Sequence, residues 1–255
     1  MRLYDVHAHL ADPRVAARAP SIVRIARRRG VRGVVVAAAR LREWPDILRL
    51  TGQPEVRAAL GVHPFFLEDW SQSAASRLQQ LLTANPTAIR AVGEIGLDLQ
   101  GGRDQAERQI AVLRDQLRIA QAANLPVILH NRKSWPDFFK VLKDAGIERL
   151  HGVCHHFSGS REIARSLLDL GLHLSFCGPA TYANARRIRT AIRYAPLDRI
   201  LTESDCPDLP GDLWRGRKSY PWHVARIVET IAELRQLKAD QVADRIADNA
   251  EALFG

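Results

Sequence analysis

The sequence predicts an α/β protein of the (β/α)8 class, a single TIM-barrel domain spanning residues 1–255. Three observations lead to this prediction. The length of 255 residues is typical of such barrels, eight short apolar runs alternate strictly with eight longer amphipathic ones, and polar residues stand where the apolar runs end. A doubly wound open sheet is the alternative. It would usually have fewer strands, and no Gly-x-Gly-x-x-Gly follows the first apolar run.

The apolar runs are almost continuous, as expected for strands that are buried on both faces of a parallel sheet. The predicted strands are Leu3–His7, Gly33–Ala37, Val56–Gly61, Ile89–Glu94, Val127–His130, Gly152–His155, His173–Phe176 and Ile200–Glu203.

The stretches between the strands place apolar residues at three- and four-residue steps, which is the period of an amphipathic helix. The clearest case carries Ile110, Leu113, Leu117 and Ala120. The predicted helices are Val15–Arg29, Trp44–Leu50, Ala74–Ala84, Asp104–Ala123, Trp135–Ala145, Arg161–Leu170, Ala183–Ala195 and Pro221–Leu234, and a last helix, Ala239–Phe254, is expected to pack on the barrel.

The composition is that of an ordinary globular protein, with 46% hydrophobic and 25% charged residues, which argues against intrinsic disorder. No apolar run approaches the roughly 20 residues of a membrane-spanning helix. The N-terminal residues MRLYDVHAHL lack the apolar segment of a secretory signal. We therefore expect a cytoplasmic protein without membrane contact. Cys154, Cys177 and Cys206 form no CxxC pair, and we expect them to be reduced.

The chain is basic, with 37 Lys and Arg against 28 Asp and Glu and a formal net charge of +9. Such a balance permits a polyanionic partner such as nucleic acid but does not establish one, because the basic residues are spread along the chain. The oligomeric state is left open by the sequence, and a monomer is compatible with it.

Ionisable side chains gather at the ends of the predicted strands. In a (β/α)8 barrel these ends meet on one rim and build the active site. The residues at this rim are His7, His9, His63, Glu94, His130, His155, Glu203 and Asp205.

His7 and His9 are the first pair to consider. Residues two apart in a strand point to the same face, so two imidazoles can grip one cation. Alone this His-x-His pair is a weak signal, and it becomes strong when joined to Glu94, His130, His155 and Asp205. Four histidines with two carboxylates suit Zn, Mn, Ni or Fe better than Mg or Ca, which prefer sites made only of oxygen ligands. Six ligands can hold two ions if one carboxylate bridges them.

With these residues in place, the sequence resembles the TatD family of metal-dependent deoxyribonucleases almost end to end. The matching motifs are Asp5-Val-His7-Ala-His9, Gly61-Val-His63-Pro64, Gly93-Glu94-Ile-Gly96-Leu-Asp98, Leu129-His130-Asn-Arg132, His155-His-Phe-Ser-Gly159, Glu203-Ser-Asp205-Cys-Pro207, and Asn249-Ala250 with Leu253-Phe254.

The resemblance implies a dinuclear metal site. His7, His9 and Asp205 would hold one ion, His130 and His155 would hold the second, and Glu94 would bridge them. The ions would be Mg, Mn or Zn. Members of the family are nucleases, some of them 3′–5′ exonucleases on single strands, and TatD-like aminoacyl-tRNA deacylases exist.

The sequence departs from the family pattern outside this set. Phe65 stands where the family often has the second histidine of His-Pro-His, Lys218–Pro221 replaces Asn-Glu-Pro, and His156 follows His155. These changes leave the metal set intact and bear on the substrate pocket.

Other rim residues have weaker assignments. Asp205 is expected to ligate and to take a proton from water. Glu203 would orient a ligand histidine or form a rim salt bridge. His63 would bind substrate, donate a proton to the leaving oxygen, or simply be a hydrogen-bonded rim residue. Arg132 carries a planar guanidinium that suits a phosphate.

Some neighbouring residues are expected to stay outside the chemistry. His156 should point away from His155, because neighbours in a strand face opposite sides. The indoles of Trp135, Trp214 and Trp222 could stack on bases, but packing is the commoner role for such residues. Cys206 is expected to pack as a small apolar residue.

The leading functional prediction is a dinuclear metal hydrolase that cleaves phosphodiesters, most plausibly those of DNA. Hydrolysis of esters or amides, including deacylation of aminoacyl-tRNA, uses the same barrel and water chemistry and is the alternative. A catalytically silent nucleic-acid-binding scaffold is the third reading, and a lost metal ligand would have supported it.

Overall fold

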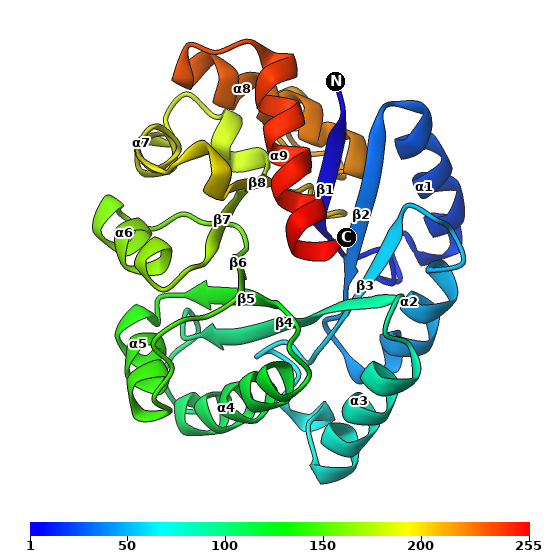
Figure 1. Cartoon of the computed structure of the whole chain (residues 1–255), viewed down its shortest axis with the longest axis vertical. Coiled ribbons are helices and arrows are strands. Elements are labelled where there is room, and N and C mark those ends of the chain that lie inside the picture. The colour runs from blue at the N-terminus through cyan, green and yellow to red at the C-terminus, as the bar shows by residue number, and fades with distance from the viewer.

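In the computed structural model, which describes residues 1–255, each of the eight apolar runs forms a strand, and the strands pair in parallel in their order along the chain. Figure 1 shows them as a ring with the helices outside it, so the predicted (β/α)8 barrel is confirmed. The strands are β1 (Leu3–Ala8), β2 (Val31–Ala37), β3 (Val56–Leu60), β4 (Ile89–Asp98), β5 (Val127–Arg132), β6 (Gly152–Cys154), β7 (His173–Phe176) and β8 (Ile200–Thr202).

The amphipathic stretches form the helices that cover the ring. They are α1 (Ala19–Arg28), α2 (Trp44–Leu50), α3 (Gln72–Ala84), α4 (Ala106–Ala122), α5 (Trp135–Asp144), α6 (Arg161–Asp169), α7 (Arg186–Tyr194), α8 (Val224–Arg235) and α9 (Ala239–Phe254).

Four helices, α1, α4, α7 and α8, begin later than predicted, and two of them follow a 3-10 turn. The segment Ala16–Arg18 is a separate 3-10 turn, and α1 starts behind it with Pro20 in its first turn. Similarly, Pro221–His223 is a 3-10 turn before α8. Proline lacks the N–H of a helix interior and is tolerated in a first turn, so it stands at both of these boundaries.

The strand ends differ from the prediction in two directions. β4 runs past Glu94 to Asp98, and β5 runs past His130 to Arg132. β6 and β8 stop one residue before His155 and Glu203, so these two side chains lie in the loops that follow.

Gly96 makes the long pairing of β4 with β5 possible. It pairs with His130 at a φ of +154°, and a Cβ at this position would lie 1.9 Å from the backbone oxygen of His130. Only glycine fits this close approach, which holds the end of β4 against the strand that carries His130.

The barrel interior is filled with side chains and closed at the end opposite the rim. Twelve buried apolar residues form a separate inner cluster, and α9 contributes Ala250, Leu253 and Phe254 to it. Figure 1 shows α9 lying across the ring beside β1 and β8. Arg90 on β4 donates to the backbone oxygen of Phe254 over 3.2 Å, which anchors the end of the chain.

The seam between β8 and β1 closes the ring without a regular ladder. Its only bridge pairs Ala8 with Cys206. Side chains complete the closure: the buried carboxylate of Asp5 accepts from the backbone N–H of Ser204 (2.8 Å) and from its hydroxyl (2.6 Å), and Thr202 donates to the oxygen of Tyr4 (3.2 Å).

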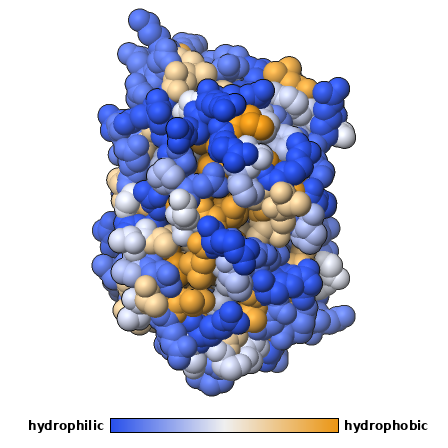
Figure 2. Space-filling model, turned by 90° about the vertical axis from the view of Figure 1, so that its right-hand side faces the viewer, coloured by the Kyte–Doolittle hydropathy of each residue, from blue (hydrophilic) through white to orange (hydrophobic).

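Figure 2 shows the face that lies to the right in Figure 1, which is mainly hydrophilic with apolar side chains visible between the charged ones. A cavity of about 730 Å³ lies between α1 and α2. It contains no histidine, and its carboxylates pair with arginines, Glu55 with Arg27 and Asp46 with Arg49. No helix of the structure is both long enough and apolar enough to cross a membrane.

Candidate metal centre

A second cavity, about 510 Å³, opens at the rim formed by the C-terminal ends of the strands. It is lined by most of the residues that the sequence singled out: His9, His63, Glu94, His130, Arg132, His155 and Asp205. His7 is fully buried beneath them. The strand-end argument therefore brought together side chains that are up to two hundred residues apart in the sequence.

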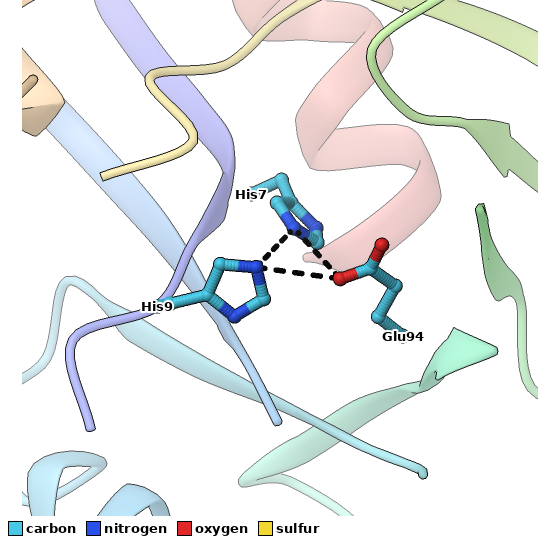
Figure 3. A group of neighbouring side chains, drawn as sticks. All are labelled: His7, His9 and Glu94. Atoms are coloured by element: carbon cyan, nitrogen blue, oxygen red, sulfur yellow. Dashed lines mark hydrogen bonds and ion pairs between the residues drawn. The ribbon is translucent and has the colours of Figure 1, made fainter. Parts of the chain in front are cut away.

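The first group of converging atoms comes from the ends of β1 and β8, the first and last strands of the barrel. Nε2 of His7 lies 3.1 Å from Nε2 of His9, and Oε2 of Glu94 lies 3.4 Å and 3.3 Å from these two nitrogens (Figure 3). Oδ1 of Asp205 lies 3.5 Å from both of them. We call His7, His9 and Asp205 the first ligand group.

The second group lies on the other side of the same carboxylate. Oε1 of Glu94 is 2.8 Å from Nδ1 of His130 and 2.7 Å from Nε2 of His155, and these two nitrogens are 3.1 Å apart. We call His130 and His155 the second ligand group.

Glu94 thus presents one oxygen to each ligand group. Imidazole nitrogens about 3 Å apart repel one another as lone pairs unless a proton or a cation lies between them. Nδ1 of His7 is buried without a hydrogen-bond partner. The donor set is nitrogen and carboxylate oxygen, which first-row divalent metals prefer. The residues therefore fit metal ions, and subsets of them, such as His7 with His9 and Glu94, have the compactness of a metal site.

Hydrogen bonds turn two of the imidazoles toward the centre. Nδ1 of His9 donates to the backbone oxygen of Ala37 (3.2 Å), which leaves Nε2 facing Glu94. Nε2 of His130 donates to the buried carboxylate of Asp98 (3.0 Å), which leaves Nδ1 facing Glu94. A carboxylate or carbonyl behind a ligand histidine fixes its tautomer and orientation.

Asp98 is the residue that sequence reasoning missed, although it belongs to the motif that begins at Gly93. The signal was available. Residues two apart in a strand share a face, so Glu94, Gly96 and Asp98 all point into the barrel once β4 is taken to continue.

Glu203 stands behind His155 in a similar way. Its Oε1 lies 3.3 Å from Nδ1 of His155 and also accepts the backbone N–H of His156 (2.7 Å). Glu203 is fully buried, so its carboxylate lies behind His155 and not at the exposed edge of the rim.

The electrostatics of the metal-free centre follow from burying opposite charges together. Burial opposes the charged form of Glu94, but the surrounding histidines His155, His63 and His7 and the bond from His130 outweigh it, so its pKa lies well below the usual value. Glu94 is therefore a carboxylate across the physiological range.

His9, His130 and His155 respond in the opposite direction, whereas burial lowers the pKa of His7 to about 4. Burial alone would lower the pKa of His9, yet its contacts with Glu94 and Asp205 raise that pKa to about 9. The pKa of His155 is raised well above 6.5 by Glu94 and Glu203, against the effect of burial. The protonated forms of His9 and His155 are therefore favoured beside the carboxylates.

The pKa of Asp205 is raised, in contrast to the lowered pKa of Glu94. Burial raises its pKa to about 7, partly offset by the charges of His9 and His155. Its backbone has a φ of +50°, in the left-handed region that non-glycine residues rarely adopt. Such conformations cluster at functional sites, where the surrounding structure holds them.

His63 has a hydrogen bond that fixes its role more narrowly than the sequence could. Its Nδ1 accepts the backbone N–H of Phe65 (3.0 Å), so the proton of the neutral ring sits on Nε2. Burial lowers the pKa of His63 to about 3, which keeps the ring neutral. Nε2 lies 3.6 Å from Oε1 of Glu94 and faces the centre as a hydrogen-bond donor, not as a ligand lone pair.

His156 corrects one prediction. It was expected to point away from the centre by strand alternation, but β6 has already ended and His156 has a φ of +44°. Its side chain lines the rim cavity beside His155. Alternation fails here because the residue is in a turn.

The remaining predictions concern packing. Trp214 stacks on His223 with ring centroids 3.6 Å apart, Trp222 stacks on Tyr220 at 4.7 Å, and Trp135 packs among phenylalanines. The three cysteines are buried and unpaired. Burial raises the pKa of the Cys206 thiol, which is consistent with the inert packing role.

Comparison with known proteins agrees with this geometry. A model of the family described as TatD related DNase matches residues 4–255. The chain is 33% identical to the uncharacterized metal-dependent hydrolase YabD of Bacillus subtilis, over 99% of this chain and 98% of that protein. It is 31% identical to the 3′-5′ ssDNA/RNA exonuclease TatD of Erwinia amylovora, over 99% of this chain and all of that protein.

A solved structure agrees as well. The crystal structure of YjjV, a TatD homologue from Escherichia coli, matches with a TM-score of 0.92 and 36% sequence identity, covering 99% of this chain and 98% of that one. A barrel of this topology, a family match over almost the whole length and relatives above 30% identity lead to one conclusion: the chain belongs to the TatD family of metal-dependent hydrolases.

Proposed function

We propose that this protein is a metal-dependent deoxyribonuclease that hydrolyses phosphodiester bonds of single-stranded DNA from the 3′ end. The observation that carries the proposal is the position of Glu94, whose two oxygens face two separate ligand groups at the floor of an open rim cavity. The family description and the exonuclease name of the Erwinia amylovora relative support nucleic acid as the substrate class.

His7, His9 and Asp205 would hold one divalent cation, His130 and His155 would hold a second, and Glu94 would contribute to both groups. Bound there, such ions supply two effects, a lowered pKa for a water molecule and neutralisation of charge on a phosphoryl oxygen. The pairing of two sites suits an in-line displacement at phosphorus, in which both the attacking and the leaving oxygen carry charge.

The chain's own residues handle the protons. Oδ1 of Asp205 faces His7 and His9, and Oδ2 accepts no hydrogen bond from the protein, so it is available to take a proton from the attacking water. His63 presents the N–H of Nε2 to the same space and would donate a hydrogen bond to a substrate oxygen.

Arg132 provides the binding charge. It ends β5, is exposed, lines the rim cavity and makes no ion pair or side-chain hydrogen bond within the protein. A free guanidinium at the edge of an anionic-substrate site is suited to a non-bridging pair of phosphate oxygens.

The experiment that tests the proposal uses metal-stripped protein resupplied with Mg²⁺, Mn²⁺ or Zn²⁺ and a single-stranded DNA labelled at its 5′ end. We expect progressive shortening from the 3′ end with at least one metal. Asp205→Asn should lose about 100-fold or more of the rate, since it removes a proton acceptor. Asp144→Asn, at the exposed end of α5, is the matched control and should leave the rate unchanged.

The competing activities have separate outcomes in this assay. Protein that binds two ions but leaves DNA intact with every metal, while hydrolysing an aminoacyl ester, would replace the nuclease with the acyl hydrolase. DNA binding without turnover of either substrate would point to the silent scaffold instead.

A further inference from the structure

The rim cavity has an aromatic ring at its mouth that the chemistry described so far does not use. Phe65 follows His63 and Pro64 after β3, and 59% of its surface is exposed. The other strongly exposed large apolar residues, Met1, Ile25, Leu213 and Leu237, are aliphatic. An exposed apolar side chain needs no explanation by itself. A phenyl ring at the opening of a polar cavity does need an explanation, because it is left exposed to solvent at the place where a ligand enters.

The ring is held in this position by its neighbours. The backbone N–H of Phe65 donates to His63, and its ring centroid lies 4.6 Å from that of His63 in an edge-on arrangement. The centroid of His130, in the second ligand group, is 6.4 Å away. Next to it, Phe66 packs under the guanidinium of Arg40 at 4.2 Å, which fixes the turn from the other side. Both phenylalanines line the cavity, but Arg40 covers the ring of Phe66, whereas Phe65 is largely exposed.

The tryptophans at the rim do not compete for this role. The ring faces of Trp214 and Trp222 are stacked on His223 and Tyr220, and the guanidinium of Arg29 covers Trp222 at 4.8 Å. Of the two phenylalanines that line the cavity, Phe65 is therefore the one whose ring is open to a ligand.

Phe65 and Arg132 line the same cavity, one offering a bare ring and the other an unpaired cation. A ligand that satisfies both carries a flat aromatic group and an anionic group joined by a short spacer, which is the chemistry of a nucleotide. We propose that Phe65 is a specificity-determining residue that stacks on the base next to the bond to be cleaved, while Arg132 holds the phosphate.

This inference rests on the proposed nuclease function and deepens it. Every base has a π-face, so a stacking contact tolerates any sequence. A base can stack on Phe65 only when it has left the duplex, so the contact selects single strands and frayed ends.

The test compares two substrates with the same phosphodiester backbone. One is a single-stranded DNA with all its bases, and the other carries tetrahydrofuran abasic residues at its two 3′-terminal positions. For the parent protein we expect the abasic substrate to have a KM about five- to 150-fold higher at similar kcat, which is the range that loss of one stacked base gives. Phe65→Ala should raise the KM of the normal substrate by the same factor and leave that of the abasic substrate unchanged.

Two further variants separate stacking from a structural effect. Phe65→Tyr keeps the ring and should behave as the parent protein. Leu237→Ala removes another exposed apolar side chain, in the turn between α8 and α9, and should change nothing. If Phe65→Ala weakens both substrates equally, or if the parent protein does not distinguish them, the stacking role is wrong.

Failure of the nuclease proposal would be visible separately. If neither substrate is cleaved with any metal, the same oligonucleotides with a fluorescent label give equilibrium binding by anisotropy. In that measurement, removing the bases and introducing Phe65→Ala must each weaken the binding affinity by the same factor. The two changes together must weaken it no more than either one alone. Additive losses, or equal binding of the two oligonucleotides, would overturn the inference without reference to turnover.

Discussion

Single hydrogen bonds decide which atoms of the centre face inward. Neutral imidazole has one donor and one acceptor nitrogen, and a partner on one of them settles the other. Asp98 behind His130 leaves Nδ1 for the centre, whereas the backbone N–H of Phe65 on His63 leaves a proton on the inward atom. Two histidines at the same rim are thereby given different chemistry, one as a candidate ligand and one as a donor.

Asp98→Asn tests this at the residue scale. The amide keeps the size of the side chain and an acceptor for the N–H of Gln100, but it removes the charge that His130 faces. We expect one of two ions to bind about 10- to 100-fold more weakly while the other is unaffected. Isothermal titration with Mn²⁺ or Zn²⁺ measures this, with Asp144→Asn as the control. Equal weakening of both ions would contradict a role confined to the second ligand group.

At the scale of elements, the position of each strand end explains what the sequence could and could not show. His7, His9 and His130 were predicted because each stands where an apolar run of the sequence ends. Asp98 was missed because Gly96 carries no side chain to mark the inner face of β4, so the alternation that would have exposed Asp98 is interrupted. His156 was misplaced because no residue near it signals that β6 ends after three residues.

The seam between β8 and β1 gives a prediction about stability. Ser204→Ala removes a hydroxyl that donates to the buried Asp5 and accepts the backbone N–H of Cys206. Leaving buried groups unsatisfied costs about 1–3 kcal/mol. The Tm should fall by about 2–4 °C for each kcal/mol in a chain of this size.

Thermal unfolding of the metal-free protein is the measurement. Ser76→Ala on α3 is the matched control, because the hydroxyl of Ser76 makes no hydrogen bond in the structure and alanine favours the helix. A Tm for Ser204→Ala equal to that of the control would show that the seam does not depend on this bond.

At the scale of the whole molecule, protons and metal ions compete for one set of atoms. The pKa of His9 is about 9 in the metal-free fold, above its usual value near 6.5. When folding raises the pKa of a histidine, the resulting stabilisation is fully present below the pKa of the unfolded state. It is lost as the pH rises through the pKa of the folded state. The metal-free protein should therefore lose stability between pH 6.5 and 9.

Metal binding should follow the opposite trend. Each ion must displace protons, so its affinity rises by about tenfold per pH unit for every proton released, up to the pKa of that group. Saturating metal stabilises the folded chain by about 2.7 kcal/mol at a hundredfold excess over Kd. We expect the rise in Tm on adding Mn²⁺ or Zn²⁺ to be larger at pH 8 than at pH 6. A rise independent of pH, or an equal rise in His7→Ala, would contradict this.

The meeting of the two chain ends at the seam has a consequence for synthesis. His7 and His9 are synthesised well before Asp205 and the strand β8 that brings it to them. Until then the ring is open, α9 has not sealed its far end, and the nitrogen pair lacks its partner. A chain that lacks β8 and Asp205 therefore cannot assemble the first ligand group.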